Sequence, residues 1–413
     1  MSAVSMAFQV WLVGRIGPAG IGLYQLVLSV TGLGMTFAVS GIRFASTRLV
    51  AEELGGENGA VGAAMGRCLR YALVFGCAAG AILYFLAEPI GFLWIGDART
   101  VRSLRLSALS MPCGALCASM SGYFTAGGRV WKSSVVHLAE QLFGIVLVAL
   151  FLERAPRGDI EQSCLAVTAG RVAADVFSLI LKSIVYILDR RKYYGGTDGG
   201  VRLTGRMLKL AMPLAVSAYA RSALSTMQHL LVPKGLKTAG FSADRALSGY
   251  GVIQGMVLPV IFFPSCVMAA VAELIVPELT RAQVAGDRES IQKTVDSLFC
   301  KSAAFSGAVA VLLFLFSDIL GRTIYDSAEA GYYIRVLAPL VPVMYTDMAV
   351  DGCLKGLGQQ LYSMGINILD AVTGLLLVWR LLPKYALSAY IAIIYCTEIL
   401  NFVLSYRRLN QVT

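Results

Sequence analysis

Charged side chains are scarce in this chain of 413 residues. Asp, Glu, Lys and Arg make up 15% of it and there are 2 histidines, whereas soluble domains carry about 25% charged residues. The shortage of histidine argues against a His-rich metal cluster. The sequence also lacks a nucleophile elbow and a phosphate-binding Gly loop followed by Lys and Ser or Thr. We therefore predict no enzyme activity, no cofactor and no metal site.

Apolar residues are abundant instead, at 57% of the chain. A helix needs about 20 apolar residues to cross roughly 30 Å of hydrocarbon. The sequence predicts an all-α polytopic membrane protein with about 12 transmembrane helices. The predicted spans are residues 1–14, 20–42, 69–88, 104–126, 133–152, 162–187, 207–232, 249–276, 296–317, 332–353, 362–381 and 386–405.

The second half of the chain repeats the first. The segment Gly20–Gln25 aligns with Gly249–Gln254, 229 positions later, and a shift of 230 aligns Gly91, Arg105, Pro112, Gly122, Gly128, Ser133 and Gly144 with Gly321, Arg335, Pro342, Gly352, Gly358, Ser363 and Gly374. Six spans per copy place both copies in the bilayer with the same orientation. We predict two parallel six-helix lobes, residues 1–187 and 207–413, joined by a cytoplasmic linker of residues 188–206.

The basic residues predict the orientation. Lys and Arg are more numerous on the side that holds both termini, with the run Arg190-Arg191-Lys192 in the linker. The positive-inside rule then places both termini in the cytoplasm. This distribution over short loops also explains the net charge of +10 by orientation and contact with membrane lipids rather than by nucleic-acid binding.

The repeat also bears on the first span. Ser2-Ala3-Val4-Ser5 aligns with Ser222-Ala223-Leu224-Ser225, whose span begins near Met207. We therefore expect the first helix to be truncated, with roughly 15 residues before Met1 missing. The alternative is a short first helix.

Polar residues within the spans follow helical spacing and form two stripes. One stripe is Gln25, Ser29, Thr36, Ser40, Arg43 and Thr47, and the other is Ser217, Arg221, Ser225 and His229. Gln254 is the repeat mate of Gln25, and Gln9 is the mate of His229. Stripes related in pairs predict a wet cleft between the two lobes. The alternative is interhelical hydrogen bonding within each lobe.

Intramembrane charges are costly and are therefore candidates for function. Arg221 lies deep in its span, where it requires an anion or a buried partner such as Glu273. Glu140 and Asp370 occupy equivalent places near the starts of their spans. These carboxylates are candidates for coupling to Na⁺ or H⁺, and the alternative is stabilisation of the helix N-terminus.

Several motifs resemble one family. The segments Gly20–Leu26, Ser40–Ile42, Ser46–Glu53, Leu274–Leu279 and Gly352–Gln359 are similar to those of the stage V sporulation protein B family. These are polysaccharide-biosynthesis transporters in the superfamily of lipid II flippases and multidrug and toxin extrusion antiporters. The resemblance implies a V-shaped two-lobe transporter of the bacterial cytoplasmic membrane, working by alternating access.

The resemblance also points to a substrate-binding set. Relatives often carry an arginine at the position of Gln9 and a small residue or proline at that of Arg43, so the cationic charge of the cavity is expected at Arg43 and Arg221. The predicted substrate-binding residues are Arg43, Arg221, Gln25, Gln254, His229 and Gln9.

Three functions follow from these observations. The leading one is a monomeric flippase for a polyprenyl-pyrophosphate-linked saccharide, such as a peptidoglycan precursor, in sporulation or cell-envelope synthesis. The alternative is a cation-coupled multidrug-type antiporter. The third is a non-transporting scaffold for cell-wall or spore-coat assembly.

Overall fold

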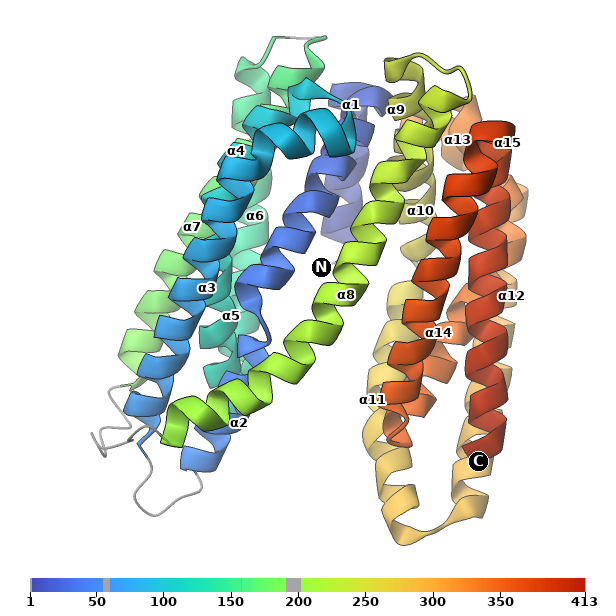
Figure 1. The fold of residues 1–413 in the computed structure, drawn as a ribbon. Helices are drawn as coiled ribbons and strands as arrows, with labels where there is room; N and C mark the ends of the chain where they lie inside the picture. Colours follow the sequence, from blue (N-terminus) through green and yellow to red (C-terminus); the bar gives the residue numbers. More distant parts are fainter. Residues whose placement is uncertain (1, 55–59, 157, 191–201, 413) are drawn as a thin grey trace. The chain divides into compact units, whose positions relative to one another are not determined.

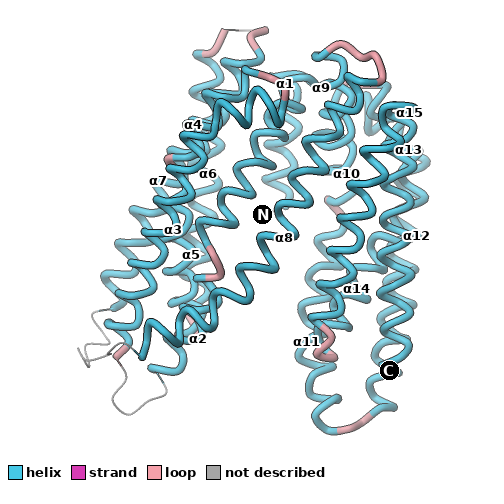
Figure 2. The backbone as a smooth tube through the Cα atoms, viewed as in Figure 1, coloured by secondary structure: helices cyan, strands magenta, loops and turns pink. Residues whose placement is uncertain are grey.

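The computed structural model describes residues 2–54, 60–156, 158–190 and 202–412. Every regular element in these ranges is helical, and short loops join the helices (Figure 2). The prediction of an all-α protein is confirmed. The predicted linker, residues 188–206, falls largely on residues 191–201, which lie outside the described residues.

Contacts divide the chain into two compact units, which we name by their main segments. The N-unit is Leu26–Thr226, and the C-unit is Met1–Gln25 with Met227–Thr413. Helices α1 (Ser2–Val39) and α8 (Arg202–Thr238) each contribute to both units. The predicted lobes, residues 1–187 and 207–413, remain a prediction, since the units are defined by packing and the lobes by the repeat.

The remaining helices of each unit follow in chain order (Figure 1). The N-unit contains α2 (Ile42–Leu54), α3 (Val61–Pro89), η1 (Ile90–Ile95), η2 (Ala98–Thr100), α4 (Val101–Ala108), α5 (Met111–Ala126), α6 (Val130–Arg154) and α7 (Ile160–Arg190). The C-unit contains α9 (Ala243–Gly251), η3 (Val252–Val257), α10 (Leu258–Phe262), α11 (Ser265–Ala285), α12 (Arg288–Tyr325), α13 (Ala328–Leu337), η4 (Ala338–Leu340), α14 (Val341–Gly356) and α15 (Gln360–Val412).

Two of the longest helices are each interrupted by one residue with a left-handed backbone. Gly17, before Pro18, has φ 70° and ψ 173°, and Ala386 has φ 50° and ψ −134°. Neither pair of angles is helical. Each helix therefore consists of two segments, in agreement with the sequence-based division into spans 1–14 and 20–42 and into spans 362–381 and 386–405.

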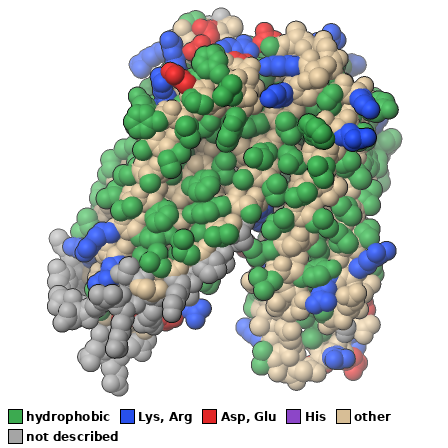
Figure 3. All heavy atoms as spheres, in the orientation of Figure 1, with side chains coloured by type: hydrophobic (Ala, Val, Ile, Leu, Met, Phe, Trp, Pro, Cys, Tyr) green, Lys and Arg blue, Asp and Glu red, His purple; other side chains and the backbone are tan. Residues whose placement is uncertain are grey.

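Eight helical stretches of the described chain are long and apolar enough to cross a membrane. The first, Ala3–Leu54, and the last, Gln360–Val412, each cover two predicted spans. The predicted spans 104–126 and 207–232 are helical but do not meet this requirement. Figure 3 shows hydrophobic side chains over the visible helix surfaces of each unit and most Lys and Arg side chains toward helix ends. The chain is a multi-pass membrane protein.

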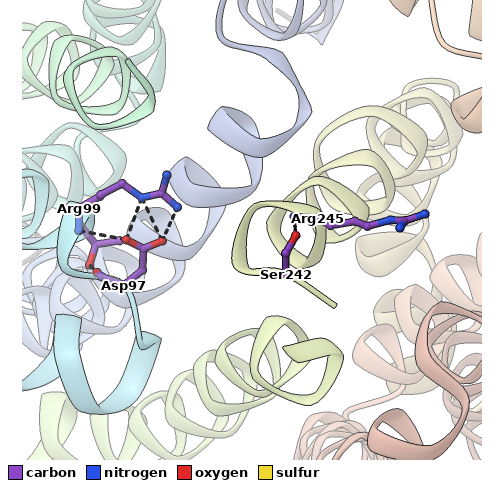
Figure 4. A network of polar contacts seen from close by, with 5 residues as sticks. Asp97, Arg99, Ser242 and Arg245 are labelled. Carbon is purple, nitrogen blue, oxygen red and sulfur yellow. Dashed lines mark hydrogen bonds and ion pairs between the residues drawn. The ribbon is translucent and has the colours of Figure 1, made fainter. Parts of the chain in front are cut away.

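Polar side chains cap helices where loops end. Ser242 accepts a hydrogen bond at its Oγ from the backbone N–H of Arg245 (3.4 Å) and so begins α9. Asp97 accepts one from the backbone N–H of Arg99 (3.0 Å) and pairs with the guanidinium of the same residue (2.8 Å; Figure 4). Such caps satisfy amide groups that have no partner within the helix.

The repeat holds in three dimensions at its ion pairs. Arg105 Nη2 contacts Glu88 Oε1 at 2.7 Å in the N-unit. Arg335 and Asp318, each 230 positions later, form the same ion pair in the C-unit. The two copies therefore join their third and fourth spans in the same way.

The repeat holds at hydroxyl groups and turns as well. Ser133 donates to Ser121 (3.0 Å), and the repeat mate of Ser133, Ser363, donates to Asp351, the mate of Ser121. The glycines that precede these serines have matching left-handed backbones, with φ 67° at Gly128 and 69° at Gly358. Equivalent residues make equivalent contacts, so the duplication seen in the sequence is a duplication of structure.

Candidate functional site

A break between α1 and α2 shapes the candidate site in the N-unit. Two consecutive residues there have left-handed backbones, Ser40 with φ 44° and Gly41 with φ 71°. A Cβ atom on Gly41 would lie 2.6 Å from the carbonyl oxygen of Ala211 in α8. Only glycine fits this position, because a side chain would meet both the backbone strain and that carbonyl.

Hydrogen bonds hold Ser40 in this strained conformation. The fully buried Ser40 Oγ bonds to the hydroxyl of Tyr71 (3.0 Å) and to that of Tyr219. The hydroxyl of Tyr71 also donates to the carbonyl oxygen of Ser40 (3.2 Å). Side chains from α3 and α8 thus over-determine a backbone geometry that an L-residue adopts only at a cost.

A pocket of about 680 Å³ adjoins the break. This volume lies in the range of small-molecule sites, about 300–1,000 Å³. Most of its wall is apolar, and the polar groups on it are Thr36, Arg43, Thr47 and Thr125. The full lining is Met35, Thr36, Val39, Gly41, Arg43, Phe44, Thr47, Thr125 and Ala218.

Arg43 gives the pocket a positive charge. Its side chain is exposed, and within the described residues its guanidinium forms no hydrogen bond or ion pair. The residue is the second of α2, whose first turn contains no acidic residue. A helix N-terminus carries partial positive charge, so Arg43 and the dipole of α2 both favour an anion.

The other predicted arginine, Arg221, lies on the part of α8 that belongs to the N-unit. It is exposed, and no acidic side chain of the described N-unit residues pairs with it. The same stretch of α8 is tied to α1 by bonds from Thr36 Oγ1 to Ser222 Oγ (3.2 Å) and from Thr226 Oγ1 to the carbonyl of Ser29 (3.1 Å). A partnership of Arg221 with Glu273 remains a prediction.

Four predicted site residues lie in the C-unit, and three of them have partners there. Gln254 Nε2 donates to the hydroxyl of Tyr390 (2.6 Å) and Gln9 Nε2 to the carbonyl oxygen of Gly255 (3.0 Å). His229 Nδ1 lies 3.1 Å from the hydroxyl of the buried Tyr250. The fourth, Gln25, is half-buried.

The two predicted coupling carboxylates have different surroundings. Glu140 Oε2 accepts a hydrogen bond from Ser178 Oγ (2.6 Å) and lies 3.5 Å from His137 Nδ1. Asp370 Oδ1 is buried and has no hydrogen-bond partner within the described residues. Buried carboxylate oxygens normally accept a hydrogen bond. Of the two predicted coupling residues, Asp370 is therefore the one whose carboxylate has an unfilled acceptor in the described structure, as Asp347 Oδ1 also has.

The structure brings together Thr36, Arg43 and Thr47 of the first predicted stripe. It assigns Arg221 to the same unit and Gln9, Gln25, Gln254 and His229 to the other. The sequence analysis did not identify the partner residues Tyr71, Tyr219, Tyr250, Tyr390 and Ser178. Tyr71, Tyr250 and Tyr390 lie near the starts of their predicted spans, where tyrosines are common in membrane proteins, so the sequence does not distinguish these three from interfacial anchors.

Apolar helices, a repeated arrangement of contacts and a cationic pocket at the start of α2 are features of a membrane transporter. A profile of the family described as MatE matches residues 1–150 and 237–379. The match covers more than half of the chain, and the chain belongs to this family.

Two curated relatives agree with this assignment. Stage V sporulation protein B of Bacillus subtilis (strain 168) is 22% identical over 388 residues, which is 92% of this chain and 75% of that protein. Sporulation protein YkvU of the same organism is 20% identical over 251 residues, or 60% of this chain and 56% of that protein. The predicted family resemblance is confirmed.

Solved structures share the fold. An inward-facing multidrug resistance MATE family transporter of the MOP superfamily superposes with a TM-score of 0.76 at 13% identity, covering 100% of this chain and 95% of the other. Lipid II flippase MurJ, in an inward closed conformation, gives a TM-score of 0.76 at 12% identity, covering 99% and 86%. The two-lobe transporter fold is thereby established.

Proposed function

We propose that this protein is a flippase that moves a polyprenyl-pyrophosphate-linked saccharide across the bacterial cytoplasmic membrane by alternating access. The termini are cytoplasmic, the chain works as a monomer, and the lipid tail of the substrate stays in the bilayer. The similarity to stage V sporulation protein B supports a role in sporulation or cell-envelope synthesis. The similarity to the lipid II flippase fold supports a peptidoglycan precursor as substrate.

The observation that carries the proposal is Arg43, which lies in the pocket at the start of α2 and has no ion-pair partner in the described part of the chain. A pyrophosphate presents several anionic oxygens, and a guanidinium binds two of them at once in a planar fork. The hydroxyls of Thr36 and Thr47 line the same pocket and add polar groups to it, although each donates its proton to a backbone carbonyl of its own chain segment, Gly32 (2.9 Å) and Arg43 (2.8 Å). The apolar remainder of the lining suits a substrate that enters from lipid.

The proposed substrate-binding set is larger than this pocket. Arg221 adds a second cation in the N-unit. Gln9, Gln25, Gln254 and His229 are proposed to contact the saccharide, because amide and imidazole groups exchange hydrogen bonds with sugar hydroxyls.

A flipping assay with fluorescent lipid II in liposomes tests the role of Arg43. Arg43→Ala removes the charge, and we expect flipping to fall at least tenfold. Arg43→Lys keeps the charge without the fork and is expected to give an intermediate rate. The matched control is Arg48→Ala, because Arg48 lies one turn further on, is 57% exposed and pairs with Glu52 at 3.2 Å.

The controls decide between outcomes. The proposal is supported if the wild type flips lipid II, Arg43→Ala does not, and Arg48→Ala still does. Absence of flipping by correctly folded wild-type protein would contradict the substrate. Equal losses for the two alanine variants would contradict the role of the pocket.

A second candidate function is a cation-coupled antiporter. The buried Oδ1 of Asp370, which has no hydrogen-bond partner among the residues that the structure describes, favours it. An intramembrane carboxylate without a hydrogen-bond donor is suited to take up H⁺ or Na⁺. Glu140, its repeat mate, already accepts a hydrogen bond from Ser178. The coupling role is therefore proposed for Asp370 first and for Glu140 second.

Dye export from vesicles driven by a Na⁺ or H⁺ gradient tests this alternative. Asp370→Asn should abolish coupled export, whereas Glu140→Gln should reduce it less. If Asp370→Asn leaves gradient-driven export intact, Asp370 has no coupling role.

A further inference from the structure

The tightest backbone approach between the repeats is a contact of two glycines, Gly22 in α1 and Gly251 in α9, both in the C-unit. A Cβ atom on Gly22 would lie 2.2 Å from the carbonyl oxygen of Leu247. A Cβ atom on Gly251 would lie 2.0 Å from the carbonyl oxygen of Pro18. Both distances are far below any real Cβ contact, so the two helix backbones touch without side chains between them.

The contact is reciprocal about the repeat. Gly251 is the repeat mate of Gly22, and Leu247 is the mate of Pro18, each 229 positions later. Residue i of one copy thus contacts residue j of the other, and j contacts i, as in an interface across a two-fold axis. The contacts at this crossing therefore follow the symmetry of the repeat.

The surroundings of the crossing are dry and tightly packed. Ile21 is fully buried and Leu247 is 1% exposed. Gly255 extends the contact, since a Cβ atom there would lie 2.7 Å from Ile21 Cγ1. The wide-turn helix η3 follows directly after Gly251, and such π-helical turns concentrate at functional sites.

The crossing lies next to proposed site residues. Gln25 and Gln254 each stand three residues after their glycine, about one helical turn further along. The start of α9 is at the opposite end of the C-unit from the C-terminus (Figure 1). A substrate held near the two glutamines could not pass this end while the backbones touch.

We propose that the Gly22–Gly251 crossing is a seal that closes the transport route at the end opposite the C-terminus, and that it separates when the transporter opens there. The inference rests on alternating access from the proposed function, but not on the identity of the substrate. Both glycines belong to this one contact. A methyl group on either one is enough to hold the seal apart.

Cysteine labelling tests the seal. Leu247→Cys, in a chain whose nine native cysteines are replaced by alanine, reports on water access with a membrane-impermeant maleimide. We expect slow labelling with both glycines present and at least fivefold faster labelling with Gly22→Ala or Gly251→Ala. The double variant should label no faster than the faster single variant, because both changes open one contact.

Matched controls separate the seal from a general effect of adding methyl groups. Gly14→Ala lies in the same helix as Gly22, Gly365→Ala lies in α15, and a Cβ atom at either position meets nothing within 4 Å. Both should leave labelling unchanged. Gly255→Ala meets only the side chain of Ile21, which can shift, and is expected to give a smaller increase.

Thermal unfolding in detergent shows which variants are folded. If Gly22→Ala and Gly251→Ala do not fold, the labelling of Gly255→Ala tests the seal in their place. Folded variants that label like the wild type would overturn the seal, as would equal increases in the two controls. Faster labelling in Gly22→Ala together with absent lipid II flipping in the wild type would support the seal and contradict only the substrate.

Discussion

At the scale of the residue, function depends on a few positions whose identity the backbone dictates. Gly41 combines a left-handed φ with a carbonyl oxygen where its Cβ would be. The neighbouring Ser40 tolerates a left-handed φ because two phenols bind its hydroxyl. The start of α2, and with it Arg43, is positioned by this pair of residues.

Gly41→Ala should destabilise the protein by about 1–3 kcal/mol or more, because backbone strain adds to the clash with Ala211. The measurement is the thermal unfolding midpoint in detergent. Gly32→Ala, in α1 and with nothing within 4 Å of its Cβ, should stay close to the wild type. A midpoint for Gly41→Ala equal to that of Gly32→Ala would show that α8 does not pack on the break.

Tyr219→Phe removes one of the two hydroxyls that bind Ser40. We expect a loss of about 0.5–1.5 kcal/mol in the free energy of unfolding, as for a typical hydrogen bond, and reduced substrate binding through the displaced Arg43. Tyr84→Phe is the control, since its ring is 43% exposed and its hydroxyl forms no hydrogen bond within the described residues. Equal stability of the two variants would mean that the Ser40–Tyr219 bond contributes nothing.

At the scale of the element, the helices of each unit are joined by repeated close contacts. In each copy the glycine after the copy's third span packs against the next helix. These glycines are the repeat mates Gly91 and Gly321, and their partners, Val101 and Gly331, are repeat mates as well. In the N-unit a Cβ atom on Gly91 would lie 2.6 Å from Val101 Cγ2, and in the C-unit a Cβ atom on Gly321 would lie 2.4 Å from the backbone nitrogen of Gly331. One copy has a side chain at this contact and the other has bare backbone.

This difference predicts that replacing the two glycines by alanine has unequal effects on stability. Gly321→Ala should be clearly more destabilising than Gly91→Ala, because the backbone of Gly331 cannot move aside whereas the side chain of Val101 can rotate. Thermal unfolding of the two variants side by side measures the difference. A larger loss for Gly91→Ala would mean that the N-unit is the more rigid of the two at this contact.

At the scale of the whole molecule, the distribution of Lys and Arg predicts the orientation in the membrane. We expect a fluorescent protein fused after Thr413 to fluoresce, as a cytoplasmic reporter does. Gly240 is a loop position with open space around it. An epitope inserted there should be reached by antibody only from the side of the membrane opposite the cytoplasm. The reverse pattern would invert the proposed direction of transport.

The amino-acid sequence by itself determined the helical membrane class, the duplication, the family and the division of α1 and α15 into two segments each. Hydrophobic content and helical periodicity are properties of many residues together. The duplication is visible because repeat mates such as Arg105 and Arg335 are identical residues. These properties are local or additive, so they can be read without knowing which helices touch.

Only the tertiary structure decided which polar residues are engaged. Gln254 and His229 are both polar residues within predicted spans, and each bonds to a tyrosine of another helix. The guanidinium of Arg43, by contrast, has no bonded partner among the described residues. The reciprocal contact of Gly22 with Gly251 is likewise invisible in one dimension. Hydrogen bonds and backbone approaches depend on ångström distances between segments far apart in the chain, and sequence spacing constrains these distances only within a single helix.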